Sequence, residues 1–171
     1  MTTPSIHLGV RADTEGVIRR LAVKAVAEID GRLLMLRSAT GGDYKFPGGG
    51  AEAGEDDATA LARELDEECG RDVVRVGPLV LRVLEEHPAR EDPRRRFEME
   101  SRYYDCDVSG VRRSPVLSEN EHREGLHEVL VTWREAIETN RAVLERDGDR
   151  PPWVDRELLV LEFLARERGL S

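Results

Sequence analysis

The sequence predicts an α/β fold in which helices pack against a β-sheet. Runs of apolar and β-branched residues typical of strands come first, followed by a helix, more strands and finally two helices. The chain has 171 residues, 39% of them hydrophobic, which is enough for one domain with a substantial core. This order of elements also fits an α+β arrangement, so both are kept open at this point.

In the N-terminal part of the chain, we expect a polar lead-in followed by a β-hairpin. Residues 1–16 form the lead-in, and a single domain is expected over 17–171. Residues 17–38 contain two apolar runs on either side of Asp30 and Gly31, a residue pair typical of tight turns. These residues therefore predict a two-stranded hairpin.

A helix is predicted at about 56–69, after a short extended piece and three consecutive glycines. Asp56 or Asp57 is suited to cap its first turn, and Gly70 is suited to end it. One apolar stripe recurs at the helical period and predicts a buried face. Its members are Ala58, Leu61, Ala62, Leu65 and Cys69.

The second half of the chain predicts three strands and two helices. The strand-like runs lie at 72–84, 97–108 and 128–133, and a polar, arginine-rich arm separates the first two. A loop is expected at 109–125. One helix is expected to start near Trp133, and a last helix with a broad apolar face is expected at 153–169.

Composition disfavours several classes of function. The net charge of −9 argues against a surface for long nucleic acids, which is normally basic. No run approaches the roughly 18 apolar residues of a membrane-spanning helix, so no membrane partner is expected. Cys69 and Cys106 form no zinc or disulfide pattern, which fits a reducing cytosol and predicts a cytoplasmic protein.

A dense group of carboxylates lies on the helix predicted at 56–69. At about 100° per residue, Glu64, Glu67 and Glu68 share an arc of about 100° beside the apolar stripe. Like charges at this spacing repel, and a hard divalent cation such as Mg²⁺, which prefers oxygen ligands, would relieve the repulsion. The alternative is a solvated acidic face in which Arg63 pairs with Glu67.

The stretch from Gly49 to Arg71 resembles the Nudix box of Nudix hydrolases. Eight positions match the box at its fixed spacing, including both glycines and every charged position: Gly49, Glu55, Arg63, Glu64, Leu65, Glu67, Glu68 and Gly70. Arg71 departs from the pattern, because an aliphatic residue is usual there; Val73 or Val74 is expected to supply the packing. The resemblance implies an α/β/α sandwich with a mixed β-sheet and a C-terminal helix.

The resemblance also implies roles for the residues of the box. Three match the metal-binding and catalytic carboxylates of the family, namely Glu64, Glu67 and Glu68. Gly49 matches the glycine whose carbonyl often joins the metal ligands, and Glu55 with Arg63 matches an ion pair that ties the loop to the helix. The implied cofactor is Mg²⁺ or Mn²⁺.

The sequence leaves two candidate positions for the general base, one on the helix predicted at 56–69 and one in the 118–128 loop. Glu64 is the first candidate, with Glu68 as the main metal ligand. The alternative is an acid of the 118–128 loop, where Glu121 is favoured as a base or further metal ligand over Glu119, Glu124 and Glu128. His122 and His127 of that loop are expected to be solvated.

Three residues near the glycines are candidates for binding substrate. Arg37 and Lys45 could meet phosphate groups, although ordinary surface charge explains them equally well. Tyr44 could stack on a base or ring, whereas Phe46 is expected to pack within the strand.

The function expected from the resemblance is metal-dependent hydrolysis of a diphosphate linkage in a small nucleotide derivative. Decapping or removal of oxidised nucleotides would use the same box. The alternative from another class is a nucleotide-sensing or regulatory module without turnover, but such modules tend to lose carboxylates that this chain keeps. The oligomeric state stays open, with a homodimer as one option.

Overall fold

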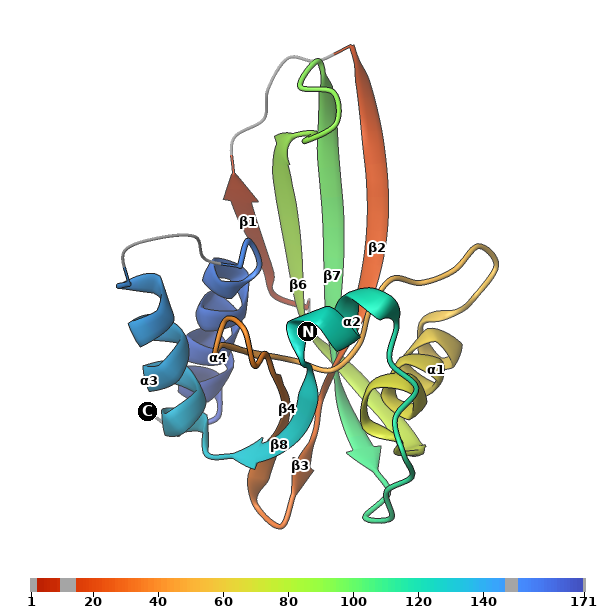
Figure 1. Cartoon of the computed structure of the whole chain (residues 1–171), viewed down its shortest axis with the longest axis vertical. Coiled ribbons are helices and arrows are strands. Elements are labelled where there is room, and N and C mark those ends of the chain that lie inside the picture. Colours follow the sequence, from red (N-terminus) through yellow and green to blue (C-terminus); the bar gives the residue numbers. More distant parts are fainter. Residues whose placement is uncertain (1–2, 10–14, 147–150, 171) are drawn as a thin grey trace.

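The computed structural model describes residues 3–9, 15–146 and 151–170. Two β-sheets meet in the middle of the molecule, with one long helix on one side and two on the other (Figure 1). This arrangement confirms the α/β/α sandwich with a mixed sheet and a C-terminal helix.

The first sheet is mixed and carries the longest strands. Its strands, in spatial order, are β1 (Ser5–Gly9), β6 (Val73–Pro88), β7 (Arg95–Val108) and β2 (Gly16–Val26). β6 and β7 form an antiparallel hairpin, while β1 runs parallel to β6 and β2 runs parallel to β7. The far ends of β6 and β7 project well beyond the helices (Figure 1).

The second sheet is antiparallel and is built around β4 (Arg32–Arg37). The strands that pair with β4 are β3 (Glu28–Ile29), β5 (Tyr44–Lys45) and β8 (His127–Val131). Ala27 alone separates β2 from β3, so a single run of chain enters both sheets.

The described part of the chain also forms four helices: α1 (Asp57–Cys69), α2 (Glu119–Glu124), α3 (Trp133–Leu144) and α4 (Val154–Glu167). Among the described residues, no helix is both long and apolar enough to cross a membrane.

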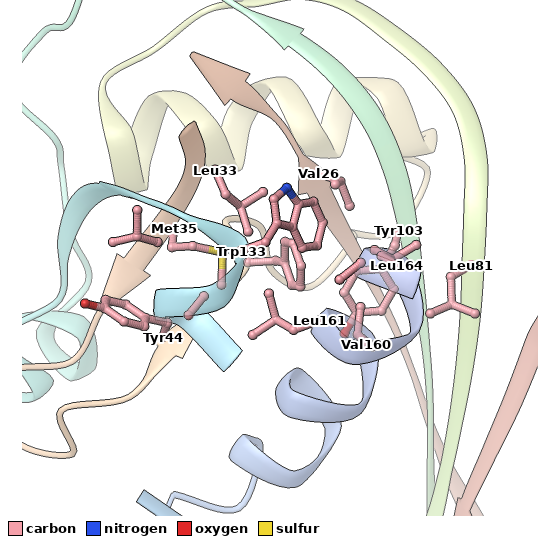
Figure 2. Packing of buried hydrophobic residues seen from close by; sticks show 14 of the residues in the cluster. Val26, Leu33, Met35, Tyr44, Leu81, Tyr103, Trp133, Val160, Leu161 and Leu164 are labelled. Atoms are coloured by element: carbon pink, nitrogen blue, oxygen red, sulfur yellow. The ribbon is translucent and has the colours of Figure 1, made fainter. Parts of the chain in front are cut away.

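The core has two parts, because alternate residues of β2 point to opposite sides of the sheet. Val23 and Ala25 pack in a cluster with residues of α1. Val26 belongs to the larger cluster under α3 and α4, which is shown in Figure 2. In this cluster the Phe46 ring meets Tyr103 edge-on, with 5.5 Å between ring centroids. The expectation that Phe46 packs inside is therefore confirmed.

Three expectations about the elements were wrong. The polar lead-in at 1–16 contains a strand, Ser5–Gly9, which pairs with β6. The predicted hairpin at 17–38 exists only as the short β3–β4 pair around Asp30 and Gly31, since β2 pairs with β7 instead. The loop expected at 109–125 contains α2, a short capped helix at Glu119–Glu124.

Candidate active site

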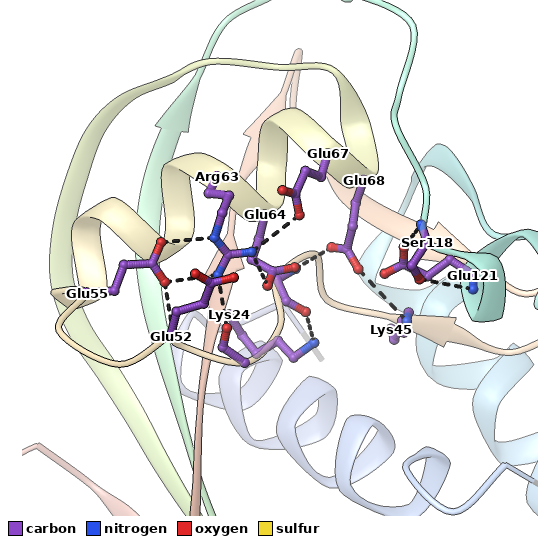
Figure 3. Close-up of polar contacts among 12 residues, drawn as sticks. Lys24, Lys45, Glu52, Glu55, Arg63, Glu64, Glu67, Glu68, Ser118 and Glu121 are labelled. Carbon is purple, nitrogen blue, oxygen red and sulfur yellow. Dashed lines mark hydrogen bonds and ion pairs between the residues drawn. The ribbon is translucent and has the colours of Figure 1, made fainter.

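The helix α1 fixes the positions of the box carboxylates. The Asp56 carboxylate accepts a hydrogen bond from the Thr59 amide at the start of the helix, and Gly70 ends it with a φ of 64°. Leu61, Leu65 and Cys69 are completely buried, as the apolar stripe predicts, but the prediction was wrong for Ala58 and Ala62, which are exposed at the edges of this face. Because this face is buried, the adjacent row of glutamates is directed toward the glycine loop (Figure 3).

Glu55 and Arg63 form a two-pronged ion pair between the loop and the helix. Arg63 donates from Nε and Nη2 to the two Glu55 oxygens at 2.9 and 3.0 Å. Arg63 Nη2 also donates to the Gly50 carbonyl at 3.0 Å, and the Glu52 amide donates to Glu55. The Arg63 hydrogen bond is the main reason that the pKa of Glu55 falls to about 2. This geometry holds the loop against the helix.

Glu64 and Glu67 both contact the same arginine. Arg63 Nη1 donates to Glu64 at 2.9 Å and to Glu67 at 3.3 Å. Glu64 is buried, and this burial raises its pKa above the ordinary value despite the arginine. Glu67 is half-exposed, with 45% of its side chain accessible.

Glu68 is the most deeply buried of the three glutamates, with 2% exposure. Its Oε2 accepts a hydrogen bond from the Gly48 amide at 2.6 Å, and its Oε1 lies 3.9 Å from Lys45 Nζ. Burial outweighs both nearby lysines and raises the pKa of Glu68 to about 7. The carboxylates thus differ in environment, although they share one helix face.

Lys24 is a functional candidate that the sequence prediction missed. Its buried ammonium donates to the carbonyls of Gly48 and Phe46, directly beneath the glycine loop (Figure 3). Burial lowers the pKa of Lys24, while the charge of Glu68 opposes this. Lys24 and Lys45 are the two lysines in a sequence with 26 lysine and arginine residues, and both face Glu68. The rarity of lysine was the one feature of the sequence that could have drawn attention to Lys24.

The glycine loop lies along the outer edge of β2. The Val23 amide donates to the Gly49 carbonyl at 2.9 Å, so one lone pair of this expected metal ligand is already used. The neighbouring Gly48 carbonyl accepts a hydrogen bond from Lys24 instead, while the Gly48 amide donates to Glu68. A side chain on Gly48 would come within 2.1 Å of the Val23 carbonyl, and one on Gly49 would come within 2.5 Å of the Glu64 carboxylate. The glycines therefore allow this close approach.

The acids of the 118–128 loop have other structural partners. Glu121 accepts a hydrogen bond from the Ser118 amide at 2.7 Å and completes the capping box of α2. Glu128 forms a buried bidentate pair with Arg71, at 2.7 Å for both hydrogen bonds.

Arg71 thus takes part in an ion pair where the Nudix pattern has an aliphatic residue. Val73 joins the α1 side of the core and supplies packing there, as expected. Val74 does not, because it is 69% exposed.

The three predicted substrate-binding residues are not equivalent. Tyr44 is 3% exposed and belongs to the core, so the prediction that it stacks on a ligand was wrong. The guanidinium of Arg37 lies over the Tyr44 ring, 5.7 Å from its centroid. Lys45 Nζ lies 3.9 Å from Glu68 Oε1 and 5.7 Å from the centroid of the Trp153 ring.

The donor set of the site suits a hard divalent cation, because it consists of carboxylate and carbonyl oxygens. Within the described ranges, no three acidic, histidine or cysteine side chains are already grouped for metal binding. The reason is that Arg63 holds Glu64 and Glu67, whereas the Gly48 amide holds Glu68.

Comparison with known proteins identifies the family. The sequence profile described as the NUDIX domain matches residues 18–159. No curated protein matched the sequence. The fold is similar to the E. coli ORF135 protein, with a TM-score of 0.53, 24% identity, and coverage of 88% of this chain and 92% of that one.

Two further solved structures share the fold. The MutT protein from Methanosarcina mazei Go1 has a TM-score of 0.57 and 17% identity, and the alignment covers 98% of this chain and 98% of that one. A NUDIX hydrolase from Nitrosomonas europaea also has a TM-score of 0.57 and 17% identity, and covers 86% of this chain and 90% of that one. At these identities the likeness concerns the fold, whereas the profile match spans most of the sequence. The chain therefore belongs to the NUDIX domain family.

Proposed function

We propose that this Nudix protein hydrolyses the diphosphate linkage of a small nucleotide derivative, with Mg²⁺ or Mn²⁺ bound by Glu64, Glu67, Glu68 and a carbonyl of the glycine loop. The observation that carries the proposal is that Glu64 and Glu68 of α1 lie against a glycine loop held by the Glu55–Arg63 pair, with Glu67 beside Glu64 on the same arginine. When bound, the metal would neutralise phosphate charge and lower the pKa of a water.

The side chains of the protein would then accept the proton of the attacking water and orient the phosphate groups. In the reaction, the water oxygen bonds to phosphorus, the bridging P–O bond breaks, and the bridging oxygen leaves with the other phosphate. Glu64 would take the proton of the water at its carboxylate, and its burial makes it a stronger base than an exposed glutamate. Lys45, which lies beside Glu68, would attract the phosphate oxygens.

A sensing module without turnover is the alternative. The retention of every carboxylate of the box favours the hydrolase. We also propose a cytoplasmic location, supported by two buried thiols, Cys69 and Cys106, that form no disulfide.

The proposal predicts that Glu64→Gln and Glu68→Gln each lower Mg²⁺-dependent turnover at least tenfold, or about 1.4 kcal/mol. Turnover is measured as release of the phosphorylated products with and without Mg²⁺, over nucleoside triphosphates, nucleotide sugars, dinucleoside polyphosphates and capped RNA. Asp66→Asn is the matched control, because Asp66 is on the same helix but pairs with Arg113 away from the site. Release that is independent of metal, or unaffected by both glutamine variants, would exclude the assignment; binding without release would indicate a sensor.

A further inference from the structure

The short strand β5 is held by strand pairing on one side and by helix side chains on the other. β4 pairs with Tyr44 and Lys45 along the first side. Along the second side, the Tyr44 amide donates to Asn140 Oδ1 of α3 at 2.8 Å, and Asn140 Nδ2 donates to the Tyr44 carbonyl at 2.8 Å. Two residues further on, the Phe46 amide donates to Glu157 Oε2 of α4 at 2.9 Å. The two side chains thus take the place of the backbone of a neighbouring strand.

Asn140 and Glu157 are polar side chains in a mostly apolar layer. Both are completely buried, on helices whose apolar residues belong to the larger core cluster. Glu157 Oε1 accepts hydrogen bonds from Arg156 at 3.0 and 3.1 Å and from Tyr103 at 3.4 Å. These contacts leave Oε2 for the Phe46 amide. Burial of a carboxylate and an amide costs free energy that apolar residues would not cost. Helix packing alone therefore does not explain this pair, whereas a need to fix the backbone of β5 does.

The segment that this pair holds leads directly into the metal site proposed above. The Phe46 carbonyl accepts a hydrogen bond from Lys24 Nζ at 3.3 Å, and the same ammonium donates to the Gly48 carbonyl. The Gly48 amide in turn donates to Glu68 Oε2 at 2.6 Å. A continuous series of contacts therefore runs from α4 to Glu68 through the backbone of residues 46–48.

Residues 46–48 have little freedom to move independently of β5. The Phe46 ring is completely buried and meets the Tyr103 ring edge-on. Pro47 has its φ fixed by its own ring. Gly48 has a φ of 122° and lies so close to β2 that only a glycine fits there. A displacement of β5 would therefore be transmitted to the Gly48 amide rather than absorbed on the way.

We propose that Asn140 and Glu157 are positioning residues for the metal site. They hold β5, and through it the Gly48 amide, at the place where this amide fixes one oxygen of Glu68. A carboxylate that is already oriented binds a cation more tightly than one that must be ordered on binding. This inference rests on the proposed function for the identification of Glu68 as a metal ligand. It gives a part in metal binding to α3 and α4, which contribute no residue of the box.

Binding of Mn²⁺ without substrate tests this role directly. The signal of free Mn²⁺ in electron paramagnetic resonance gives the dissociation constant for the natural protein and for the variants Glu157→Gln and Asn140→Leu. Glutamine has nearly the volume of glutamate, but its NH₂ group cannot accept a hydrogen bond, so one side of the Glu157 carboxylate loses its contacts in either orientation. Leucine at position 140 removes both hydrogen bonds to Tyr44. Each variant is expected to weaken Mn²⁺ binding at least about tenfold, the usual effect of removing a group that orients a metal ligand.

Glu162→Gln is the matched control. It weakens another polar contact between the same two helices, because Glu162 of α4 accepts a hydrogen bond from Arg141 of α3 at 2.6 Å on the protein surface. The control is expected to leave the Mn²⁺ dissociation constant unchanged. Thermal melts in EDTA establish which variants are folded at the temperature of the titration. If Glu157→Gln is not folded, Asn140→Leu carries the test.

A double-mutant cycle separates positioning from a general loosening of the fold. Because the proposed contacts end at Glu68, the loss of Mn²⁺ affinity caused by Glu157→Gln is expected to disappear in a Glu68→Gln background and to persist in a Glu64→Gln background. In turnover assays, Glu157→Gln is expected to raise the Mg²⁺ concentration for half-maximal rate far more than it raises KM for the substrate.

The outcomes distinguish this inference from the proposed function. Mn²⁺ binding that Glu68→Gln weakens but Glu157→Gln and Asn140→Leu leave unchanged would overturn the positioning role alone, as would an equal loss in the Glu162→Gln control. Mn²⁺ binding that neither Glu64→Gln nor Glu68→Gln affects would refute the metal site of the proposed function. Mn²⁺ binding that depends on Glu68 and Glu157, without turnover of any substrate, would refute the hydrolase and leave the positioning role standing.

Discussion

Lys24 shows how much a single side chain determines at this site. Its ammonium is buried, and it donates to two carbonyls of the loop that passes over it. An arginine would place a larger, planar group in the same space, which explains why one of only two lysines occupies this position. A search restricted to the box could not find it, because the contact joins residues 24 positions apart.

We predict that Lys24→Met lowers the free energy of unfolding of the metal-free protein by about 1–3 kcal/mol, the usual cost of leaving a buried acceptor without its donor. The cause is that Glu68 loses its buried counter-charge and the Gly48 carbonyl loses its donor. Urea denaturation in EDTA measures the effect. Lys45→Met is the matched control and should cost far less, because Lys45 is partly exposed and lies 3.9 Å from Glu68. Equal losses in the two variants would refute this role of Lys24.

At the scale of elements, the pair of Arg71 and Glu128 joins the end of α1 to β8. Arg71 also donates to the Ser109 carbonyl at 2.8 Å, so three separate segments meet at one guanidinium. Both side chains are nearly inaccessible, with 7% and 6% exposure. A buried pair of this kind specifies which segments meet, but it need not stabilise the fold more than apolar residues would.

We predict that Arg71→Leu and Glu128→Leu are each destabilising by about 3–5 kcal/mol, whereas the double variant recovers most of the loss. Each single change leaves a buried charge without its bidentate partner, although Glu128 keeps the half-exposed Arg112 at 3.9 Å. The double change restores the aliphatic residue usual at the end of the box. A double-mutant cycle from urea denaturation gives the coupling energy. Strictly additive losses would show that the two side chains act independently.

The elements that the sequence predicted well are those specified by local chemistry. The caps at Asp56 and Gly70 and the stripe of Leu61 and Leu65 fixed α1 almost to the residue. Pairing between distant strands was not predictable in this way. β2 is apolar in the manner of a hairpin strand, yet its partner is β7, some 80 positions later, and no local pattern encodes this register. The strand at Ser5–Gly9 was missed because only the pairing with β6 defines it.

At the scale of the whole molecule, buried charge makes stability depend on pH. The folded-state pKa of Glu68 is about 7, above its ordinary value of 4.5. A carboxyl with a raised pKa stabilises the fold fully below its unfolded pKa, and this contribution is lost as the pH rises through the folded value. The lowered pKa of Glu55, about 2, has the opposite sign, and its contribution is lost only in stronger acid.

We therefore predict that the metal-free protein loses up to about 3 kcal/mol of stability between about pH 4.5 and pH 7 through Glu68, at about 1.4 kcal/mol per pKa unit. Glu68→Gln should flatten this part of the profile and raise the melting temperature at pH 8 in EDTA. Mg²⁺ should do the same for the natural protein if it binds the ionised form. Parallel profiles for the natural and Glu68→Gln proteins would contradict the assignment.

The path of the glycine loop has a consequence for solubility. Residues 47–51 hydrogen-bond along β2 from Leu21 to Ala25, so they occupy a sheet margin that would otherwise offer free backbone donors and acceptors. An uncovered margin of this kind recruits strands from other molecules. Residues 47–51, which form part of the proposed active site, therefore also protect the edge of β2 against self-association. Substitutions that loosen it should be found in aggregates as well as among inactive variants.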